Sequence, residues 1–328
     1  MAFTGNRRAG SRGRGGANVV SAPAVSRPAP FFGVSRWTLA RYGFCYLVLA
    51  IPSLLFLVFR IIPMAQTFQL SVLNWDLISP VKPFVGLENF RSLLDDPNFQ
   101  LAFSNTTLFA AVTVAASTVL ALIVALPLTR RTRLEGMYQL IYFLPFVAPV
   151  VPVTVAWKWI FDTRYGIVNY LLSLVNVAPI PWLTQPDAVL WAVIIMSVWK
   201  MLGYNIVLFI VGLRAIPAEY SEAGQIDGAA GAQLFRFITL PLLMPVVLLV
   251  TVFSTISAYN VFTQIYVFAS DIQGSPGSLA RVLIYDIFEN AFRFYRMGYA
   301  SAEASVFFVL VLILTLLEFR VLRTQTEL

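Results

Sequence analysis

The longest weakly hydrophobic segment between the apolar runs of the second half of the chain, residues 219–245, carries the side chains best suited to specific polar contacts. Its acids and its single base can form charge-assisted hydrogen bonds with a second protein. The small residues between them allow a partner to approach the backbone closely. We therefore expect this segment to bind a partner, through Glu222, Ala223, Asp227, Gly228, Ala229, Phe235 and Arg236.

The same segment carries local signals for a helix that stops abruptly. Pro217 suits the first turn of a helix, and Glu219 would lie near its positive end. Gly228, directly after Asp227, predicts the stop and a turn. A second short helix is expected over residues 229–237. The alternative is a solvated loop that only joins two membrane spans.

Several kinds of chemistry are excluded by composition. The chain has no histidine, and Cys45 is its single cysteine, so an internal disulfide or a cysteine metal site cannot form. No G-x-x-x-x-G-K-[ST] phosphate-binding loop occurs. We expect no catalytic residue, no metal site and no cofactor on this chain.

The composition is that of an integral membrane protein built from helices. The 328 residues are 59% hydrophobic and only 12% charged, with a mean hydropathy of +0.77. Residues 1–42 hold seven arginines and no acid, which accounts for the whole net charge of +7. We expect this Arg-rich tail to be disordered and cytoplasmic, and to contact anionic lipid; binding to nucleic acid is not expected.

Six apolar runs are long enough to cross the hydrocarbon layer, for which about 20 residues suffice. Three prolines interrupt the third run, which predicts a kinked or broken span. The predicted spans are Phe44–Met64, Thr107–Leu128, Met137–Trp159, Val189–Leu213, Leu242–Phe268 and Ala300–Leu322.

The short-loop arginines predict the orientation, since positively charged loops stay inside. Besides the tail, Arg130, Arg131 and Arg133 follow the second run, and Arg320 and Arg323 lie at the C-terminus. With six spans these segments share one side, so both termini are expected in the cytoplasm. The partner-binding segment, between spans four and five, then lies on that side too.

The partner-binding segment resembles the E-A-A loop of permease subunits in binding-protein-dependent ABC importers, most of all the maltose and glycerol-3-phosphate type. Gly224 departs from the pattern, which usually has alanine there. A second, F-V-G-L-x-N-F-like stretch precedes span two, whereas residues 273–276 match the T-G-G-P pattern loosely. The matching residues are Glu222-Ala223-Gly224, Asp227-Gly228-Ala229, Phe235, Ile238, Leu240 and Pro241, with Phe84–Phe90 in the second stretch.

This resemblance implies a six-span permease in a bacterial plasma membrane. The loop, about residues 217–240, would be a cytoplasmic coupling helix held in a cleft of an ATPase dimer, which binds ATP and Mg. A second homologous permease would complete the membrane part, and an extracytoplasmic binding protein would deliver the solute. The implied solute is a sugar or a sugar-like compound, phosphorylated polyols included.

Polar and aromatic residues within the predicted spans are candidates for contact with such a solute, because polar groups at membrane depth usually face a cavity. Hydrogen bonding between helices is the equal alternative. Glu303 is expected to be an interfacial or pairing residue. The candidates for the cavity are Trp199, Lys200, Tyr204, Asn205, Tyr259, Asn260, Thr263 and Gln264.

Two other classes of function stay open at the level of sequence. An ion-coupled secondary carrier would use carboxylates at mid-membrane, of which the predicted spans hold almost none. A membrane scaffold would use the segment 219–245 to bind something other than an ATPase. The sequence does not name the solute.

Overall fold

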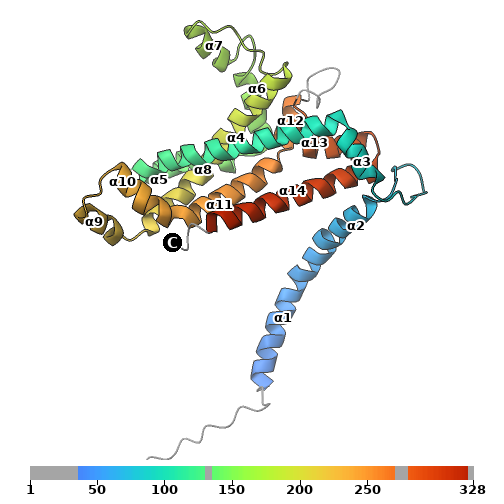
Figure 1. Ribbon diagram of the computed structural model, residues 1–328, viewed down its shortest axis with the longest axis horizontal. Helices are drawn as coiled ribbons and strands as arrows, with labels where there is room; N and C mark the ends of the chain where they lie inside the picture. Colours follow the sequence, from blue (N-terminus) through green and yellow to red (C-terminus); the bar gives the residue numbers. More distant parts are fainter. Residues whose placement is uncertain (1–35, 130–134, 270–279, 324–328) are drawn as a thin grey trace, which may run out of the picture. The chain divides into compact units, whose positions relative to one another are not determined.

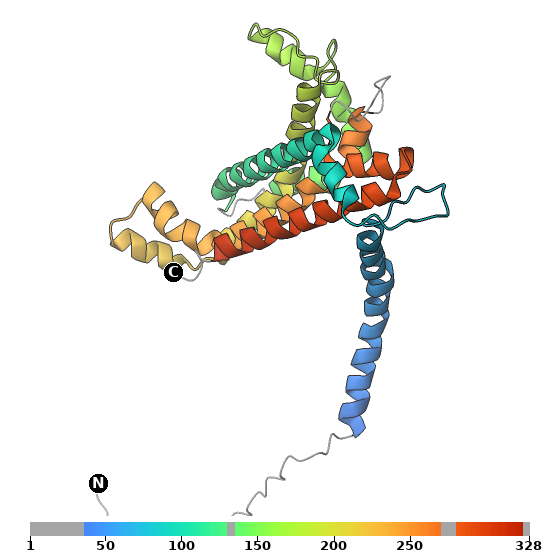
Figure 2. The ribbon, with the colours of Figure 1, turned by 45° about the vertical axis from the view of Figure 1, so that its right-hand side comes forward.

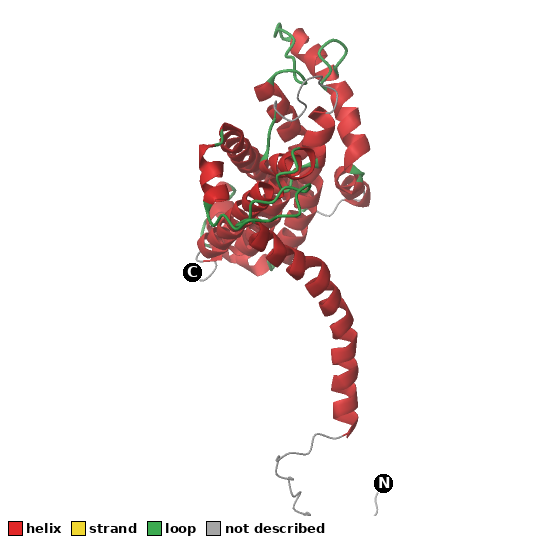
Figure 3. Cartoon of the chain, turned by 90° about the vertical axis from the view of Figure 1, so that its right-hand side faces the viewer, coloured by secondary structure: helices red, strands yellow, loops and turns green. Residues whose placement is uncertain are grey.

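The computed structural model of the protein describes residues 36–129, 135–269 and 280–323 (Figure 1). Within these ranges the chain is helical apart from its loops, with an isolated β-bridge between Leu73 and Phe84 and no strand (Figure 3). The expected all-α fold is confirmed. Most of the predicted tail, the arginines of residues 130–133 and the loop 273–276 lie outside the described residues.

The chain divides into two units, residues 1–58 and 59–328. In the first, helix α1 (Arg36–Phe56) carries no charged residue after Arg41, and every side chain from Tyr42 to Val58 is exposed. A helix with no polar face is suited to a lipid environment. The π-helical turn η1 (Leu57–Ile61) follows it in sequence, and α2 (Ile62–Leu70) begins the helices of the second unit.

Four long helices form the centre of the second unit: α4 (Pro97–Leu128), α8 (Pro186–Ala215), α11 (Leu240–Tyr259) and α14 (Met297–Arg323). Helix α4 packs against α8 and α11, and α11 also packs against α14. Figures 1 and 2 show these helices running alongside one another. The buried residues of α4 are mostly small, which lets the helix backbones approach closely.

A buried polar contact joins three of these helices. The side-chain amide of Asn205 on α8 donates to the hydroxyl oxygens of Ser117 on α4, at 3.3 Å, and Ser254 on α11, at 3.2 Å. Asn205 and Ser254 are completely buried. Hydrogen bonds of this kind hold membrane helices together, because lipid cannot satisfy such groups.

The third predicted span is broken, as its prolines indicate. Helix α5 (Glu135–Val147) ends before Pro149, and α6 (Val150–Ile160) leaves it at a bend of 96°. Pro149 adopts φ −57° and ψ 135°, an extended conformation that does not continue a helix. The loss of its backbone N–H explains why the two helices separate here.

Five helices are long and apolar enough to cross a membrane, and the bent pair makes a sixth if it counts as one span. The six predicted spans therefore agree with the structure in number if the bent pair counts as one span, but the fifth was predicted with the wrong bounds. It starts earlier, at Ala232, and ends at Tyr259. The Asn260 side chain donates to the carbonyl of Ile256 at 2.6 Å, a local bond that competes with the helical pattern.

The remaining elements are short and lie between the long helices. Helix α3 precedes α4, α7 follows α6, and α12, α13 and the π-helical turn η3 connect α11 to α14. Their bounds are Glu88–Asp95 for α3, Ile167–Leu174 for α7, Thr263–Ala269 for α12, Leu283–Phe288 for α13 and Glu289–Arg293 for η3.

Around α13 and η3 the chain buries a cluster of charges. The Arg281 guanidinium pairs with the Asp286 carboxylate and, at 3.0 Å, with that of Glu289. On α14, Glu303 is fully buried and accepts two hydrogen bonds from the Asn290 amide, at 3.1 and 3.2 Å. Glu303 is therefore a pairing residue, one of the two roles expected for it.

Candidate docking helix and membrane cavity

Helix α9 (Ala218–Ile226) follows α8 after a sharp break at Pro217. Pro217 takes the N-cap position, and Glu219 lies in the first turn. An acid in the first turn is favoured by the helix dipole. The start of the helix predicted from the sequence is confirmed.

The end of α9 is a Schellman turn. Gly228 has φ +86°, a conformation that favours glycine. Its N–H donates to the carbonyl of Gln225 at 3.1 Å, and the N–H of Ala229 donates to the carbonyl of Gly224 at 2.9 Å. These two bonds satisfy carbonyls that the last turn would leave free. The predicted stop after Asp227 is confirmed, with Asp227 as the C-cap.

The second short helix differs from the expectation. Helix α10 (Ala232–Leu234) continues through the π-helical turn η2 (Phe235–Thr239) directly into α11. It is therefore the first part of span five and not a separate element over residues 229–237. Gly231, at φ +53°, makes the turn that starts it.

Gly224 holds α9 close to η2. A Cβ atom at this position would overlap the end of the Ile238 side chain and lie 3.1 Å from Cδ1 of Leu234. Glycine, in place of the usual alanine, lets these two side chains pack directly on the helix backbone. The connection between α9 and the start of span five is thereby close-packed.

The seven candidate contact residues lie on and beside this helix. Glu222, Ala223, Asp227, Gly228 and Arg236 are exposed, and Ala229 and Phe235 are half-buried. Figures 1 and 2 place α9 and α10 at the same end of the second unit as the C-terminal end of α14 and the beginning of α5, away from α3 and α13.

Two large apolar side chains of this surface were missed by sequence reasoning. Ile226 is 87% exposed and Phe237 is 70% exposed. By hydropathy alone both are candidates for the interior. Large exposed apolar residues beside charged ones are typical of a binding surface. Their exposure depends on how α9 packs on η2, and no local signal reports it.

A cavity of about 140 Å³ lies between α4, α5, α8 and α11, and one residue of α12 also lines it. The hydroxyl oxygens of Thr113 and Ser197 are buried and have no hydrogen-bond partner among the described residues. Such groups need a partner, which a bound solute or water can provide. The lining residues are Phe109, Thr113, Phe146, Ser197, Lys200, Met201, Phe253, Ser257, Ala258, Val261 and Gln264.

Of the eight solute-contact candidates, Lys200 and Gln264 line this cavity together. The Lys200 ammonium also donates to the carbonyls of Pro145, Phe146 and Ala148, at 2.9, 3.2 and 2.7 Å. These carbonyls belong to the end of α5 and to the break after it. Lys200 therefore borders the cavity while it caps the broken helix.

The other candidates on α8 lie beside the cavity. Trp199 packs edge-on against Trp157, with ring centroids 5.4 Å apart. Tyr204 stacks between Phe146 and Phe253, at 4.7 and 4.5 Å. Two of these rings, those of Phe146 and Phe253, line the cavity, so Tyr204 supports its wall. Asn205 makes the buried contact with Ser117 and Ser254.

The remaining candidates lie around the end of α11. Tyr259 is 4% exposed and lines a different groove, of about 440 Å³, which lies between α4, α11 and α14 and is also lined by Glu318. Asn260 is exposed and ends α11. Thr263 is half-buried at the start of α12. The structure brings none of these three to the cavity of Lys200.

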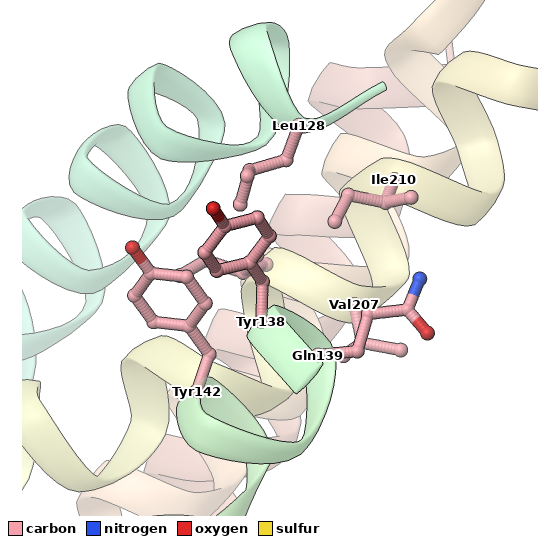
Figure 4. Close-up of a pocket in the computed structure, with 7 residues that line it drawn as sticks. Leu128, Tyr138, Gln139, Tyr142, Val207 and Ile210 are labelled. Atoms are coloured by element: carbon pink, nitrogen blue, oxygen red, sulfur yellow. The ribbon is translucent and has the colours of Figure 1, made fainter. Parts of the chain in front are cut away.

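A further cavity, between α4, α5 and α8, is too small for a solute. In Figure 4 Tyr138 and Tyr142 face it from one side, and Val207 and Ile210 from the other. Its volume of about 10 Å³ is close to the minimum for one water molecule. Within the described residues no group of His, Cys, Asp and Glu is arranged to hold a metal ion.

Comparison with known proteins agrees with this architecture. Residues 117–323 match the family described as binding-protein-dependent transport system inner membrane component. The trehalose/maltose transport system permease protein MalF of Thermococcus litoralis is 35% identical over 83% of this chain and 90% of its own. The sn-glycerol-3-phosphate transport system permease protein UgpA of Agrobacterium fabrum is 30% identical over 84% of this chain and 93% of its own.

The fold is also found in solved structures. A chain of a bacterial ABC transporter involved in the import of the acidic polysaccharide alginate superposes with a TM-score of 0.73 at 22% identity, covering 88% of this chain and 98% of that one. With its family match over residues 117–323 and its membrane-length helices, this chain belongs to the inner membrane components of binding-protein-dependent transport systems, the permease subunits of ABC importers.

Proposed function

We propose that the chain is one of two permease subunits of an ATP-driven importer of a sugar or sugar-like solute in a bacterial plasma membrane. The family supports ATP-driven, binding-protein-dependent import. The names of similar permeases refer to trehalose, maltose and glycerol 3-phosphate. An ion-coupled carrier and a membrane scaffold are both disfavoured by the family.

The cavity beside Lys200 is the main structural observation in favour of a sugar-like solute. Its aromatic rings, Phe109, Phe146 and Phe253, offer apolar faces of the kind on which a sugar ring packs. Its amide and hydroxyl groups, such as those of Gln264 and Ser257, offer hydrogen bonds to hydroxyls. The oxygens of Thr113 and Ser197, buried and without a partner among the described residues, would gain one if the cavity widens around a hydroxylated solute.

Helix α9 is the proposed docking element for a cytoplasmic ATPase dimer, which would bind ATP and Mg. Its exposed charges can pair with charges on the ATPase, and Ile226 can enter an apolar pocket. This assignment puts both termini in the cytoplasm. The opposite end of the second unit, with α3 and α13, then faces the extracytoplasmic binding protein. Such a partner has a precedent in the alginate transporter, whose structure is known in complex with a periplasmic protein.

The proposed mechanism follows from the covalent path on each side of α9. Helix α8 leads into α9 across Pro217. After α9 a turn over residues 227–231 leads into α10, which continues through η2 into α11 without a break. Helices α8 and α11 both line the cavity. A force on α9 would therefore move two walls of the cavity, provided that α9 stays rigid, as its packing through Gly224 favours.

Reconstitution tests this proposal. The chain would be assembled in proteoliposomes with a second permease, the ATPase and a binding protein, and uptake of maltose, trehalose and glycerol 3-phosphate measured. We expect uptake of one of these solutes to require internal ATP and the binding protein, and to be insensitive to ionophores. Uptake that persists without ATP and stops when the ion gradient collapses would overturn the proposal in favour of a secondary carrier.

A further inference from the structure

Helix α7 carries its apolar face on the outside of the protein. Four apolar side chains at spacings of three and four residues share one face of this helix, and all four are exposed: Ile167, Tyr170, Leu171 and Leu174. This is the spacing with which a surface helix of a water-soluble protein faces its core. In α7 the buried residue is instead the polar Asn169. Figures 1 and 2 show α7 at the far end of α6, away from the four long helices.

Asn169 fixes this orientation of the helix. Its side-chain nitrogen donates to the carbonyl of Ile180 at 2.9 Å, and its oxygen accepts from the N–H of Ile180 at 3.1 Å and from the indole N–H of Trp182 at 3.0 Å. The Trp182 ring packs against Phe161, which is fully buried in the hydrophobic core. Because turning the helix about its axis would break these hydrogen bonds, the fold holds the apolar face outward.

The exposed apolar surface begins before α7, in the second helix of the broken third span. On α6 the residues Val151, Val155 and Trp159 follow one another at spacings of four and are exposed. Tyr165, in the turn before α7, is 89% exposed. Together with α5, helix α6 is apolar enough to form a membrane span. The chain therefore carries exposed apolar residues from a membrane segment directly into α7.

The composition of this region suits neither a soluble partner nor a second membrane helix. No charged residue occurs between Arg164 and Asp187. A binding protein that docks and leaves would return a large apolar face without charges to water, where it promotes aggregation. Close contacts between membrane helices are typically made by small residues, and the exposed apolar face of α7 has none.

Lipid suits this face better. Tyrosine and tryptophan have an apolar body and a polar tip, so they concentrate where acyl chains meet head groups. Trp159, Tyr165 and Tyr170 are three such residues, and all of them are exposed.

We propose that α7 is a lipid-binding helix that lies in the membrane interface, with Ile167, Tyr170, Leu171 and Leu174 among the upper parts of the acyl chains. It anchors the end of the broken third span in the bilayer. The inference rests on the membership of the chain in a membrane family and not on the identity of the solute, so it can fail while the proposed function holds.

Fluorescence quenching in the assembled transporter, reconstituted in liposomes, tests this position. Cys45→Ser removes the native cysteine, and a single new cysteine then carries a fluorophore. It replaces Leu171, on the apolar face, or Ser173, the matched control, which is exposed on the same helix beside that face. The apolar face of an interfacial helix lies about 5–10 Å deep, so we expect nitroxide lipids labelled high in the acyl chain to quench the probe at Leu171 at least about twofold more strongly than the probe at Ser173. Aqueous iodide should show the opposite preference.

Three results would overturn the inference. Equal quenching of both probes by iodide would place the face in water. Protection of the Leu171 probe from both quenchers would mean that the second permease covers it. Protection that appears only when a binding protein is added would make the face a docking surface for that protein.

The wild-type chain provides a second measurement that does not depend on the variants. A phospholipid with a diazirine in its acyl chain would be photolysed in the same liposomes, and the adducts mapped by mass spectrometry. Trypsin releases residues 165–200 as one fragment, because no lysine or arginine lies between Arg164 and Lys200. We expect adducts within Ile167–Leu174. Adducts on the long helices with none on α7 would contradict the proposal.

Discussion

The ammonium nitrogen of Lys200 lies 2.7 Å from the carbonyl oxygen of Ala148, in the break between α5 and α6. It also reaches the carbonyls of Pro145 and Phe146. The last turn of any helix leaves carbonyls without a partner, and a broken span leaves them at membrane depth. One side chain of α8 satisfies them and ties the break to the helix that leads to α9.

Lys200→Met should therefore destabilise the protein by about 2 kcal/mol, because it leaves three backbone carbonyls without the hydrogen bonds that the ammonium now donates. The measurement is the thermal unfolding midpoint in detergent, followed by tryptophan fluorescence. Arg91→Met, at an exposed arginine on α3 outside the long helices, is the control and should leave the midpoint unchanged. Lys200→Met with normal stability but altered uptake kinetics would instead mean that Lys200 contacts the solute.

The close packing of α8 on α5 supports the role of Lys200 as the residue that caps the break. A Cβ atom at Gly203, one turn further along α8, would overlap the carbonyl of Tyr142 on α5. The two helices are thus in backbone contact just before the break. This contact holds α5 against α8 and so keeps the carbonyls at the break within reach of the Lys200 ammonium.

Lys200 could contact the solute or stabilise the helix bundle, and the sequence alone does not decide between these two roles. Prolines at 145, 149 and 152 predicted the break, because proline removes a backbone donor whatever surrounds it. Nothing local could show that a lysine 50 residues later would cap that break. For the same reason Asn205 was equally a candidate for the solute and for helix packing, and only the positions of Ser117 and Ser254 assign it.

The elements of the partner-binding surface were easier to predict than its chemistry. Pro217 marks the start of α9 and Gly228 marks its end. Each residue type favours the backbone conformation that the chain adopts there. Exposure of Ile226 and the groove around Glu318 arise from packing between segments far apart in sequence. The bond from Thr255 to Glu318, for example, joins residues 63 positions apart.

Asp227→Arg should uncouple ATP hydrolysis from transport if α9 docks on the ATPase. The substitution reverses an exposed charge without touching the core, so insertion and expression should stay normal. We expect solute uptake by the reconstituted complex to fall at least about tenfold, the effect of losing one charge-assisted contact. ATP hydrolysis and uptake would be measured on the same proteoliposomes.

Asp227→Glu, which keeps the negative charge at the same exposed position, is the matched control. It should leave the ratio of uptake to hydrolysis unchanged. Gly228→Trp should uncouple as well, but it also strains the backbone at φ +86°, so Asp227→Arg is the cleaner variant. Normal uptake by Asp227→Arg would count against docking through α9.

Removing the cation from the buried charge cluster around α13 should destabilise the protein more than Lys200→Met does. Arg281→Met would leave Asp286 buried without a cation and Glu289 with Arg293 alone; breaking a buried pair in this way typically costs about 3–5 kcal/mol. Arg293→Met removes a second partner of Glu289, but Arg293 is half exposed, so its loss should cost less than about 1 kcal/mol. Thermal unfolding of both variants in detergent would compare them. Equal effects would mean that Arg281 is not the centre of the cluster.

The N-cap residue of α4, Asp96, predicts that the stability of the protein depends on pH. Asp96 accepts hydrogen bonds from the Tyr299 hydroxyl at 2.7 Å and from the N–H of Asn98 at 2.8 Å. Burial raises the pKa of this carboxyl, but the two hydrogen bonds and the charge of Arg296 outweigh it, so the pKa lies below its ordinary value of 3.8.

A lowered pKa means that the folded state favours the ionised carboxyl. Its contribution to stability is therefore complete above the ordinary pKa of 3.8 and is lost as the pH falls through the lower value of the folded state. Asp96→Asn keeps a capping side chain without the charge. The wild type should unfold at a higher temperature than Asp96→Asn at pH 7, and the gap should begin to close near the ordinary pKa of 3.8 and go on closing as the pH falls through the lower pKa of the folded state. A gap that stays constant over this range would show that the charge of Asp96 contributes nothing, and that the cap acts through its hydrogen bonds alone.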